Sequence, residues 1–267
     1  MARFLELCME KITGKNNDII KNVKKLLSSS KHRREQGLFV LEGARLVFDV
    51  LNSFYTVSCL LITQNAYEKY KTQADEIAEH CQLAFIISDD ISEKLSDTKN
   101  PQGVFAICRM RNNADFRFIP NGRYIALDHI QDPGNLGTIV RTAEALGIDG
   151  VIVGGGCDMY NPKVLRAAMG SVLRMHIVQT DDLAQMLTGL KSKGVPVYAS
   201  TPDSNAAPVT DIDFSAGGVC VIGNEANGVS EEIKRICGSL VTIKMTGRAE
   251  SLNASAAASI LMWEMLR

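Results

Sequence analysis

The sequence MTGRAESLNASAAAS covers residues 245–259 and separates a short apolar run from the last helical pattern of the chain. It is poor in large apolar side chains, although a helix that packs on a core normally contributes several. Ser251 or Asn253 can cap the helix that follows, because a helix start leaves backbone N–H groups without partners. The alanines at 254, 256, 257 and 258 let another backbone approach closely. By itself, the stretch predicts a close-packed strand–helix junction.

Short apolar runs alternate with helical patterns on the N-terminal side of this junction. Strands are expected at 124–128, 150–155, 195–200, 218–223 and 240–245. Helices are expected at 134–146, 161–170, 181–193, 229–236 and 251–266. Nearly all-apolar strands that are separated by helices indicate an α/β fold with a mostly parallel sheet covered on both faces.

The first part of the chain carries a second α/β pattern. Strands are expected at 38–42, 56–62, 83–87 and 103–109, and helices at 16–31, 43–52, 65–80 and 89–96. A polar segment with a proline and a glycine then interrupts the alternation and indicates a linker. We therefore expect one domain at 1–110, a linker at 111–122 and a second domain at 123–267.

The composition is that of a soluble globular protein, with 46% hydrophobic and 22% charged residues and a formal net charge of -1. The charge is unevenly distributed. Residues 15–34 contain seven lysines and arginines against one acid, Asp18. Such a cluster can attract phosphate groups, although a solvated helix face would look the same.

The seven cysteines form no C-x-x-C pair, and no histidine cluster accompanies them. A metal site is therefore not expected, and an odd count of cysteines without a disulfide framework favours a reducing cytosol. The N-terminal sequence MARFLELCMEK is too short and too charged for a signal sequence, and no apolar run approaches the roughly 20 residues of a membrane span. We expect a cytoplasmic protein without a membrane segment.

Ligands of open parallel sheets bind at the carboxyl ends of the strands, so the loops at strand exits are the candidate sites. The segment LDHIQDPGNLGTIVRTAEALG, residues 127–147, combines a Pro-Gly turn with Asn135 and Arg141 near a helix start. Asn135 could be an ordinary helix cap. Arg141 lies away from the apolar stripe of the helix, and its guanidinium group suits a phosphate.

Two further strand exits are rich in glycine. Gly223-Asn224-Glu225 follows an apolar strand, and glycine there lets backbone amides approach a ligand closely. Glu225 could accept a hydrogen bond from a ligand or could be a surface residue. The other exit, residues 154–156, lacks the G-x-G-x-x-G pattern, so a nicotinamide dinucleotide is not expected.

Together and in this order, these segments resemble the SpoU branch of the SPOUT superfamily, the TrmH-like RNA 2′-O-ribose methyltransferases. The family carries three motifs. The matching residues are Asn135, Gly137 and Arg141 in the first, Gly223, Asn224 and Glu225 in the second, and Met245, Gly247, Ser251, Leu252, Asn253 and Ser255 in the third. Ala226 departs from the second motif, in which glycine is usual. Residues 33–47 resemble the SpoU substrate-binding domain that precedes many of these enzymes.

The resemblance implies a deep trefoil knot in the second domain and, before it, a smaller α/β RNA-binding domain like small ribosomal proteins. It also implies a homodimer with an active site near the subunit interface. S-adenosylmethionine is the implied cofactor, with Thr201, Gly223, Asn224, Ile243, Met245 and Leu252 as its expected binding residues. No metal is implied.

The implied reaction is methyl transfer to a ribose 2′-hydroxyl of RNA, and the large first domain favours 23S ribosomal RNA over transfer RNA. A non-catalytic RNA-binding protein with this fold is the alternative. The expected catalytic residues are Arg141, Asn135, Glu225, Ser251 and Asn253. The expected RNA-binding residues are Lys31, Arg33, Arg34 and Arg45. A guanidinium pKa above about 12 makes Arg141 a poor general base, so we expect it at least to hold the target phosphate.

Overall fold

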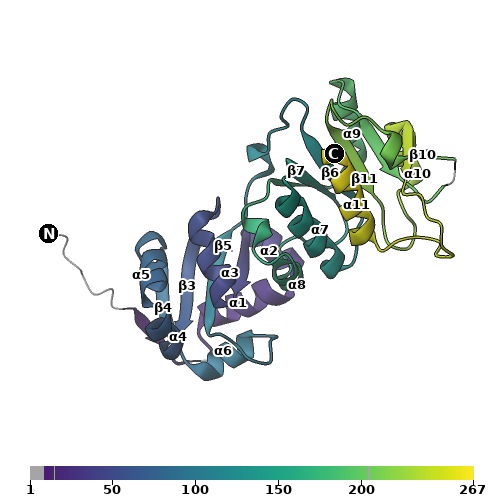
Figure 1. Ribbon diagram of the computed structural model, residues 1–267. Coiled ribbons are helices and arrows are strands. Elements are labelled where there is room, and N and C mark those ends of the chain that lie inside the picture. The colour runs from purple at the N-terminus through teal and green to yellow at the C-terminus, as the bar shows by residue number, and fades with distance from the viewer. Residues whose placement is uncertain (1–8, 15, 204) are drawn as a thin grey trace. The chain divides into compact units, whose positions relative to one another are not determined.

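The computed structural model describes residues 9–14, 16–203 and 205–267 (Figure 1). The chain forms two compact units, Met1–Arg111 with Tyr160–Leu165 and Asn112–Met159 with Arg166–Arg267, called here the N-terminal unit and the C-terminal unit. Each unit is built on its own β-sheet.

A five-stranded mixed sheet forms the centre of the N-terminal unit. Its strand order is β1 (Glu10–Ile12), β4 (Leu83–Ile87), β3 (Val57–Thr63), β5 (Val104–Arg109) and β2 (Leu38–Glu42). β1, β4 and β3 run parallel, whereas β5 is antiparallel to both β3 and β2. The sequence did not predict β1, because its three residues, EKI, are too few and too polar to show a strand pattern.

Helices cover both faces of this sheet. They are α1 (Asp18–Ser28), α2 (Ser30–Gln36), α3 (Ala44–Asp49), α4 (Gln64–Lys69), α5 (Lys71–His80) and α6 (Asp89–Leu95). α1 and α6 pack together over one face, and α4 and α5 pack against β3. The helix expected at 16–31 is two helices, because Ser29 adopts an extended conformation and its side chain accepts a hydrogen bond from the N–H of His32.

The C-terminal unit contains a seven-stranded sheet in which every strand pair is parallel. Its order is β10 (Ala207–Pro208), β12 (Ser239–Thr242), β9 (Val197–Ser200), β11 (Gly218–Ile222), β6 (Arg123–Asp128), β7 (Gly150–Gly154) and β8 (Ile177–Thr180). The predicted α/β fold with a parallel sheet is confirmed. The prediction missed β8 and β10, which are short and not fully buried.

The α-helices that lie wholly in this unit are α7 (Pro133–Leu146), α9 (Leu183–Ser192), α10 (Glu231–Cys237) and α11 (Ala254–Leu266), while α8 (Pro162–Ala167) begins in residues assigned to the N-terminal unit. α11 packs against α7 and also contacts β6 and β11, while α9 packs with α10 (Figure 1). Leu136, Ile139, Val140 and Ala143 of α7 are fully buried, as their spacing predicts, and Arg141 is exposed. Among the described residues, no helix combines the length and the apolar character needed to cross a membrane.

Candidate active site

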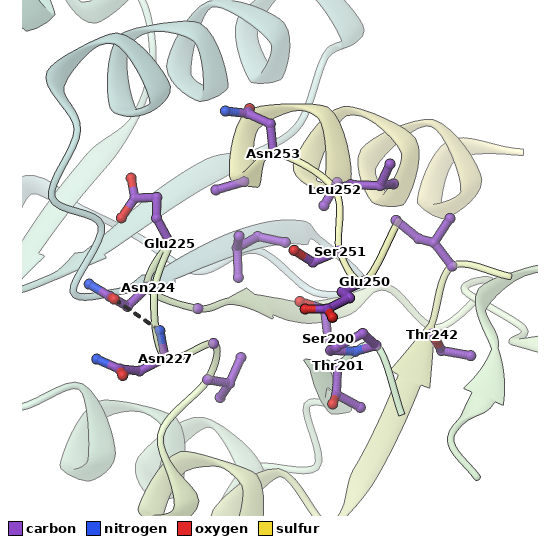
Figure 2. A pocket seen from close by; sticks show the side chains of 18 of the residues that line it. Ser200, Thr201, Asn224, Glu225, Asn227, Thr242, Glu250, Ser251, Leu252 and Asn253 are labelled. Atoms are coloured by element: carbon purple, nitrogen blue, oxygen red, sulfur yellow. Dashed lines mark hydrogen bonds between the residues drawn. The ribbon is translucent and has the colours of Figure 1, made fainter. Parts of the chain in front are cut away.

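A cavity of about 610 Å³ lies where β9, β11 and β12 end. The six residues expected to bind the cofactor all line it: Thr201, Gly223, Asn224, Ile243, Met245 and Leu252. Figure 2 shows Asn224, Glu225 and Asn227 on one side of the cavity and Glu250, Ser251 and Leu252 on the other. The carboxyl ends of parallel strands therefore form a ligand-sized opening, as this class of sheet predicts.

The first wall is the loop that follows β11. Asn224 holds this loop together, because its Oδ1 accepts hydrogen bonds from the N–H groups of Ala226 (2.9 Å) and Asn227 (3.2 Å). The backbone of Asn224 also pairs with that of Gly228. A Cβ on Gly223 would overlap the backbone of Gly228, so only glycine fits at this position.

The second wall is the segment between β12 and α11. Of the two residues predicted to cap this helix, Asn253 does so. Its Oδ1 accepts from the N–H groups of Ser255 (2.9 Å) and Ala256 (3.3 Å). Ala254 and Ala257, on the first turns of α11, line the cavity. The small residues thus bring the helix start close to the site.

A hydrogen-bond network joins three segments that are distant in sequence. Asn135 Nδ2 donates to Glu225 Oε1 at 2.9 Å, and Asn253 Nδ2 donates to Asn135 Oδ1 at 2.9 Å. Glu225 also accepts from the N–H groups of Gln131 and Asp132, both at 3.1 Å. One residue of each motif contributes to this network, which lies beside the cavity that Glu225 and Asn253 line.

The network sets the charge state of Glu225. Partial burial is the largest influence on its pKa and favours the protonated form, but the hydrogen bonds from Asn135, Gln131 and Asp132 outweigh it and lower the pKa. Glu225 is therefore a carboxylate at neutral pH.

Asn135 is not the helix cap that it resembled in the sequence. Asp132 caps α7, because its Oδ1 accepts from the N–H of Asn135 at 2.8 Å. Asn135 lies in the first turn, 8% exposed, and its side chain is free for the network. Arg141 lies further along α7, is exposed and does not line the cavity. It has no hydrogen-bond or ion-pair partner among the residues that the structure describes.

Sequence reasoning missed a second polar pair at this sheet edge. The buried carboxylate of Asp128, at the end of β6, accepts from the N–H of Ser230 (2.8 Å) and lies 2.9 Å from His129 Nδ1. His129 has a positive φ of 57°, and its carbonyl accepts from Asn224 Nδ2 at 2.8 Å. This pair fixes the second-motif loop to the exit of β6. In the sequence, the dipeptide Asp128-His129 at the end of a predicted strand was the feature that could have revealed this pair.

Two charged residues of the cavity were also missed. Glu250 immediately precedes the SLN residues of the third motif, and its position was the signal that could have revealed it. Lys234 lies on α10, where nothing in the sequence distinguishes it from a solvent-exposed lysine. Within the described residues, no group of His, Cys, Asp and Glu side chains could hold a metal ion.

The four expected RNA-binding residues differ in exposure. Lys31, Arg34 and Arg45 are exposed. Arg33 is only 2% exposed, and its guanidinium group donates to the carbonyl oxygens of Leu26 and Leu27 at the end of α1. Its assignment to RNA binding was therefore wrong, because these carbonyls need the buried donor that Arg33 supplies.

Comparison with protein families gives two matches. Residues 122–263 match the SpoU rRNA Methylase family, and residues 17–106 match the MRM3-like substrate binding domain. Over 258 residues the chain is 33% identical to the 23S rRNA (guanosine(2553)-2′-O)-methyltransferase RlmP of Bacillus subtilis, covering 96% of this chain and 99% of the relative. It is 30% identical to the 23S rRNA (uridine(2479)-2′-O)-methyltransferase of Streptomyces viridochromogenes, covering 91% of this chain and 87% of the relative.

Solved structures agree with these matches. The AdoMet-bound rRNA methyltransferase from Sinorhizobium meliloti superimposes with a TM-score of 0.85 at 31% identity, covering 96% of this chain and 97% of that chain. The SpoU methyltransferase AviRb from Streptomyces viridochromogenes, in complex with AdoMet, gives a TM-score of 0.82 at 27% identity, covering 94% and 97%. These matches extend over both units, and the chain belongs to the SpoU rRNA Methylase family.

Proposed function

We propose that this chain is an S-adenosylmethionine-dependent methyltransferase that modifies a ribose 2′-hydroxyl of 23S ribosomal RNA. The observation that carries the proposal is the network from Glu225 through Asn135 to Asn253, which joins the three motifs beside one cavity. The relatives named as 23S rRNA 2′-O-methyltransferases support the choice of RNA.

The cavity suits S-adenosylmethionine in size and charge. Its volume of about 610 Å³ falls within the range of about 300–1,000 Å³ that is usual for small-molecule sites. Glu225, Glu250 and Lys234 give the lining two negative charges and one positive charge. S-adenosylmethionine carries the opposite set, namely a sulfonium, an ammonium and a carboxylate group. Thr201, Gly223 and Leu252 would hold it together with Asn224, Ile243 and Met245.

When bound, S-adenosylmethionine supplies a methyl group that its positive sulfonium already activates. The residues of the chain must then place the ribose hydroxyl in line with this methyl group and help to remove its proton. Arg141 is exposed and unpaired within the described residues, so its guanidinium group is available to hold the phosphate next to the target ribose. Asn135, Glu225, Ser251 and Asn253 form the polar shell that orients the hydroxyl.

The N-terminal unit would select the RNA. Lys31, Arg34 and Arg45 are exposed cations of this unit and can bind phosphates. We also propose that residues 1–110 of this unit are the ribosomal-protein-like RNA-binding domain, joined by the linker at 111–122 to the catalytic domain at 123–267, from which Tyr160–Leu165 pack with the N-terminal unit. The protein would act on its RNA in the cytoplasm.

We further propose the knot and the dimer of the family. β12 lies near one edge of the sheet, whereas α11 packs on α7, β6 and β11, so the intervening segment crosses the carboxyl ends of the strands. Such a crossing is compatible with threading of the chain through a loop.

The dimer is supported by exposed apolar side chains on α11. Ile260 and Trp263 expose 38% and 59% of their surface, and an apolar face of this kind favours association with a second copy. Sedimentation should show a dimer that Trp263→Glu dissociates.

Mapping of 2′-O-methylation in total RNA tests the function. A strain that lacks this protein should lose one modification in 23S ribosomal RNA, and the wild-type chain should restore it while Arg141→Ala should not. Loss of a modification in transfer RNA alone would contradict the choice of RNA. An unchanged methylation map, together with no binding of S-adenosylmethionine to the purified chain, would instead favour the non-catalytic alternative.

A further inference from the structure

A second cavity lies in the N-terminal unit, where the carboxyl ends of β3 and β4 meet the start of β5. It encloses about 530 Å³, and α4, α6 and the loop before β5 line it. α4 follows β3 and packs with α5. α6 follows β4 and packs with α1 over one face of the sheet. The buried core cluster on that face contains no residue of α4 or α5. Neighbouring parallel strands whose helices leave toward opposite faces create a crevice in which α/β proteins bind ligands.

Four exposed polar side chains of this cavity have no partner of their own within the residues that the structure describes. The carboxylates of Asp89 and Glu93 lie one turn apart on α6, and the amides of Asn65 and Asn100 line the same cavity. None of the four has a hydrogen-bond or ion-pair partner among the described residues. Ser92, 3% exposed, also lines the cavity, and its Oγ has no hydrogen-bond partner in the described part of the chain. Polar groups grouped in this way around a hollow are typical of a binding site.

The charge and the aromatic lining of this cavity indicate which class of ligand it binds. Two carboxylates face a single cation, Lys69, so a phosphate group would meet net repulsion. An uncharged ligand with adjacent N–H donors would instead pair with one of the carboxylates. The ring of Tyr70 also lines the cavity, packed against Phe48 with Lys69 Nζ 5.1 Å from its centroid, so a planar ligand would stack on it by displacing the flexible lysine.

The loop before β5 forms one wall of the cavity. Gln102 Oε1 accepts from the N–H of Ala44 at 2.7 Å, which anchors the loop before β5. Gly103 has a positive φ of 69°, and a Cβ there would overlap the side chain of Thr63. These two features fix the position of the loop before β5, which forms one wall of the cavity.

We propose that this cavity binds an unstacked guanine base of the RNA substrate, an inference that rests on the proposed function. Guanine presents two adjacent donors, N1–H and N2–H, which match a carboxylate of α6, and acceptors O6 and N7, which match the amides of Asn65 and Asn100. Proteins that read single-stranded RNA bind its bases in this way, with hydrogen bonds to the base edge and an aromatic ring against its face. The N-terminal unit would then contribute base recognition in addition to phosphate contacts.

The test uses the full chain and nine-nucleotide oligouridylates that carry guanosine, inosine, adenosine or uridine at the central position. Fluorescence anisotropy should show guanosine binding about tenfold more tightly than uridine, with inosine intermediate because it lacks the 2-amino group. Asn65→Ala and Glu93→Gln should each reduce this preference to less than about threefold and leave the binding of oligouridylate unchanged. Glu68→Gln is the matched control, because Glu68 lies on α4 but pairs with Gln64 outside the cavity lining.

Equal affinity of the wild-type chain for all four oligomers would overturn the proposal, as would a preference that survives both variants or one for adenosine. The methylation map reports the proposed function separately. If the wild-type chain restores the 23S modification and yet shows no base preference, only the guanine site fails. If the modification is not restored and no oligomer binds, both proposals fail.

Discussion

The side-chain amide of Asn253 donates to Oδ1 of Asn135 at 2.9 Å, although 118 residues separate the two in the chain. Asn253 also caps α11 through its own Oδ1. One side chain therefore begins the helix and ties it to the first turn of α7. These two functions can be separated by substitution.

Asn253→Ser should retain the cap, because serine is as good a capping residue as asparagine, and should lose the longer reach to Asn135. We expect the free energy of unfolding to change by less than about 0.5 kcal/mol, while kcat/KM falls about tenfold or more. Asn253→Ala loses both functions and should also destabilise the chain by about 1 kcal/mol. Full activity of Asn253→Ser would show that the link to Asn135 has no role in the reaction.

Arg141→Ala should lower turnover about 100- to 1,000-fold, because the charged donor that holds the phosphate next to the target ribose is lost. The Kd for S-adenosylmethionine should stay within about twofold, since Arg141 does not line the cavity. Calorimetric titration and single-turnover kinetics separate the two effects. Arg235→Ala, an exposed arginine on α10, is the control and should behave as wild type.

Gly223→Ala should destabilise the chain by about 2–3 kcal/mol and weaken S-adenosylmethionine binding at least tenfold, because the new Cβ displaces the backbone of the cavity wall. Gly247→Ala is the matched control in the third motif. A Cβ at Gly247 meets nothing within 4 Å, and no positive φ is required there. Chemical denaturation of both variants measures the difference. Similar effects of the two substitutions would show that the crowding at Gly223 is unimportant.

Glu225→Gln tests the pH dependence of the network. The folded state lowers the pKa of Glu225, so its carboxylate stabilises the fold above the unfolded pKa of about 4.3. This stabilisation is lost as the pH falls through the lowered pKa of the folded state. The variant should melt about 1–3 °C below wild type at pH 7, and the gap should close near pH 3. A gap that is constant with pH would show that the charge of Glu225 does not support the network.

Arg33 and Arg34 are neighbours with opposite expected effects. Arg33→Ala should lower the free energy of unfolding by about 2–3 kcal/mol, because buried carbonyl groups lose a charged donor. Arg34→Ala should leave stability within about 0.5 kcal/mol and reduce the slope of log K for RNA against log salt concentration by about one. Filter binding at several salt concentrations measures the slope. An unchanged slope would place Arg34 outside the RNA interface.

Apolar periodicity and turn residues predicted most of the helices and strands, because the burial of one face sets the periodicity and the exposed connections between them favour turn residues. The stripe from Leu136 to Ala143 placed α7, and β2 and β4 lie at their predicted positions. The strand β8 was not predicted, because its sequence, IVQT, mixes polar and apolar residues on a partly buried strand. Arg33 was misassigned for a related reason, since a list of charges carries no information about which side chain a helix end will bury.

The network could not be predicted from spacing. Asn135, Glu225 and Asn253 meet because the strand order places β11 beside β6 and returns α11 to α7, and no local pattern encodes that order. The family resemblance supplied these residues as candidates, and the structure supplied their contacts. Asp128 and His129 belong to none of the motifs used, so only the structure reveals that they fix the same loop.

The wholly parallel sheet of the C-terminal unit also determines how this unit can fold. Its central pair joins Arg123 of β6 to Gly218 of β11, which are 95 positions apart (218 − 123), so a long stretch of chain must be closed before the pair forms. Contacts of such large sequence separation form slowly. The cavity requires the ends of β9, β11 and β12 and the start of α11 to be in place together, so we expect it to form late in folding. S-adenosylmethionine should therefore slow the unfolding of this protein and leave the rate of its folding unchanged.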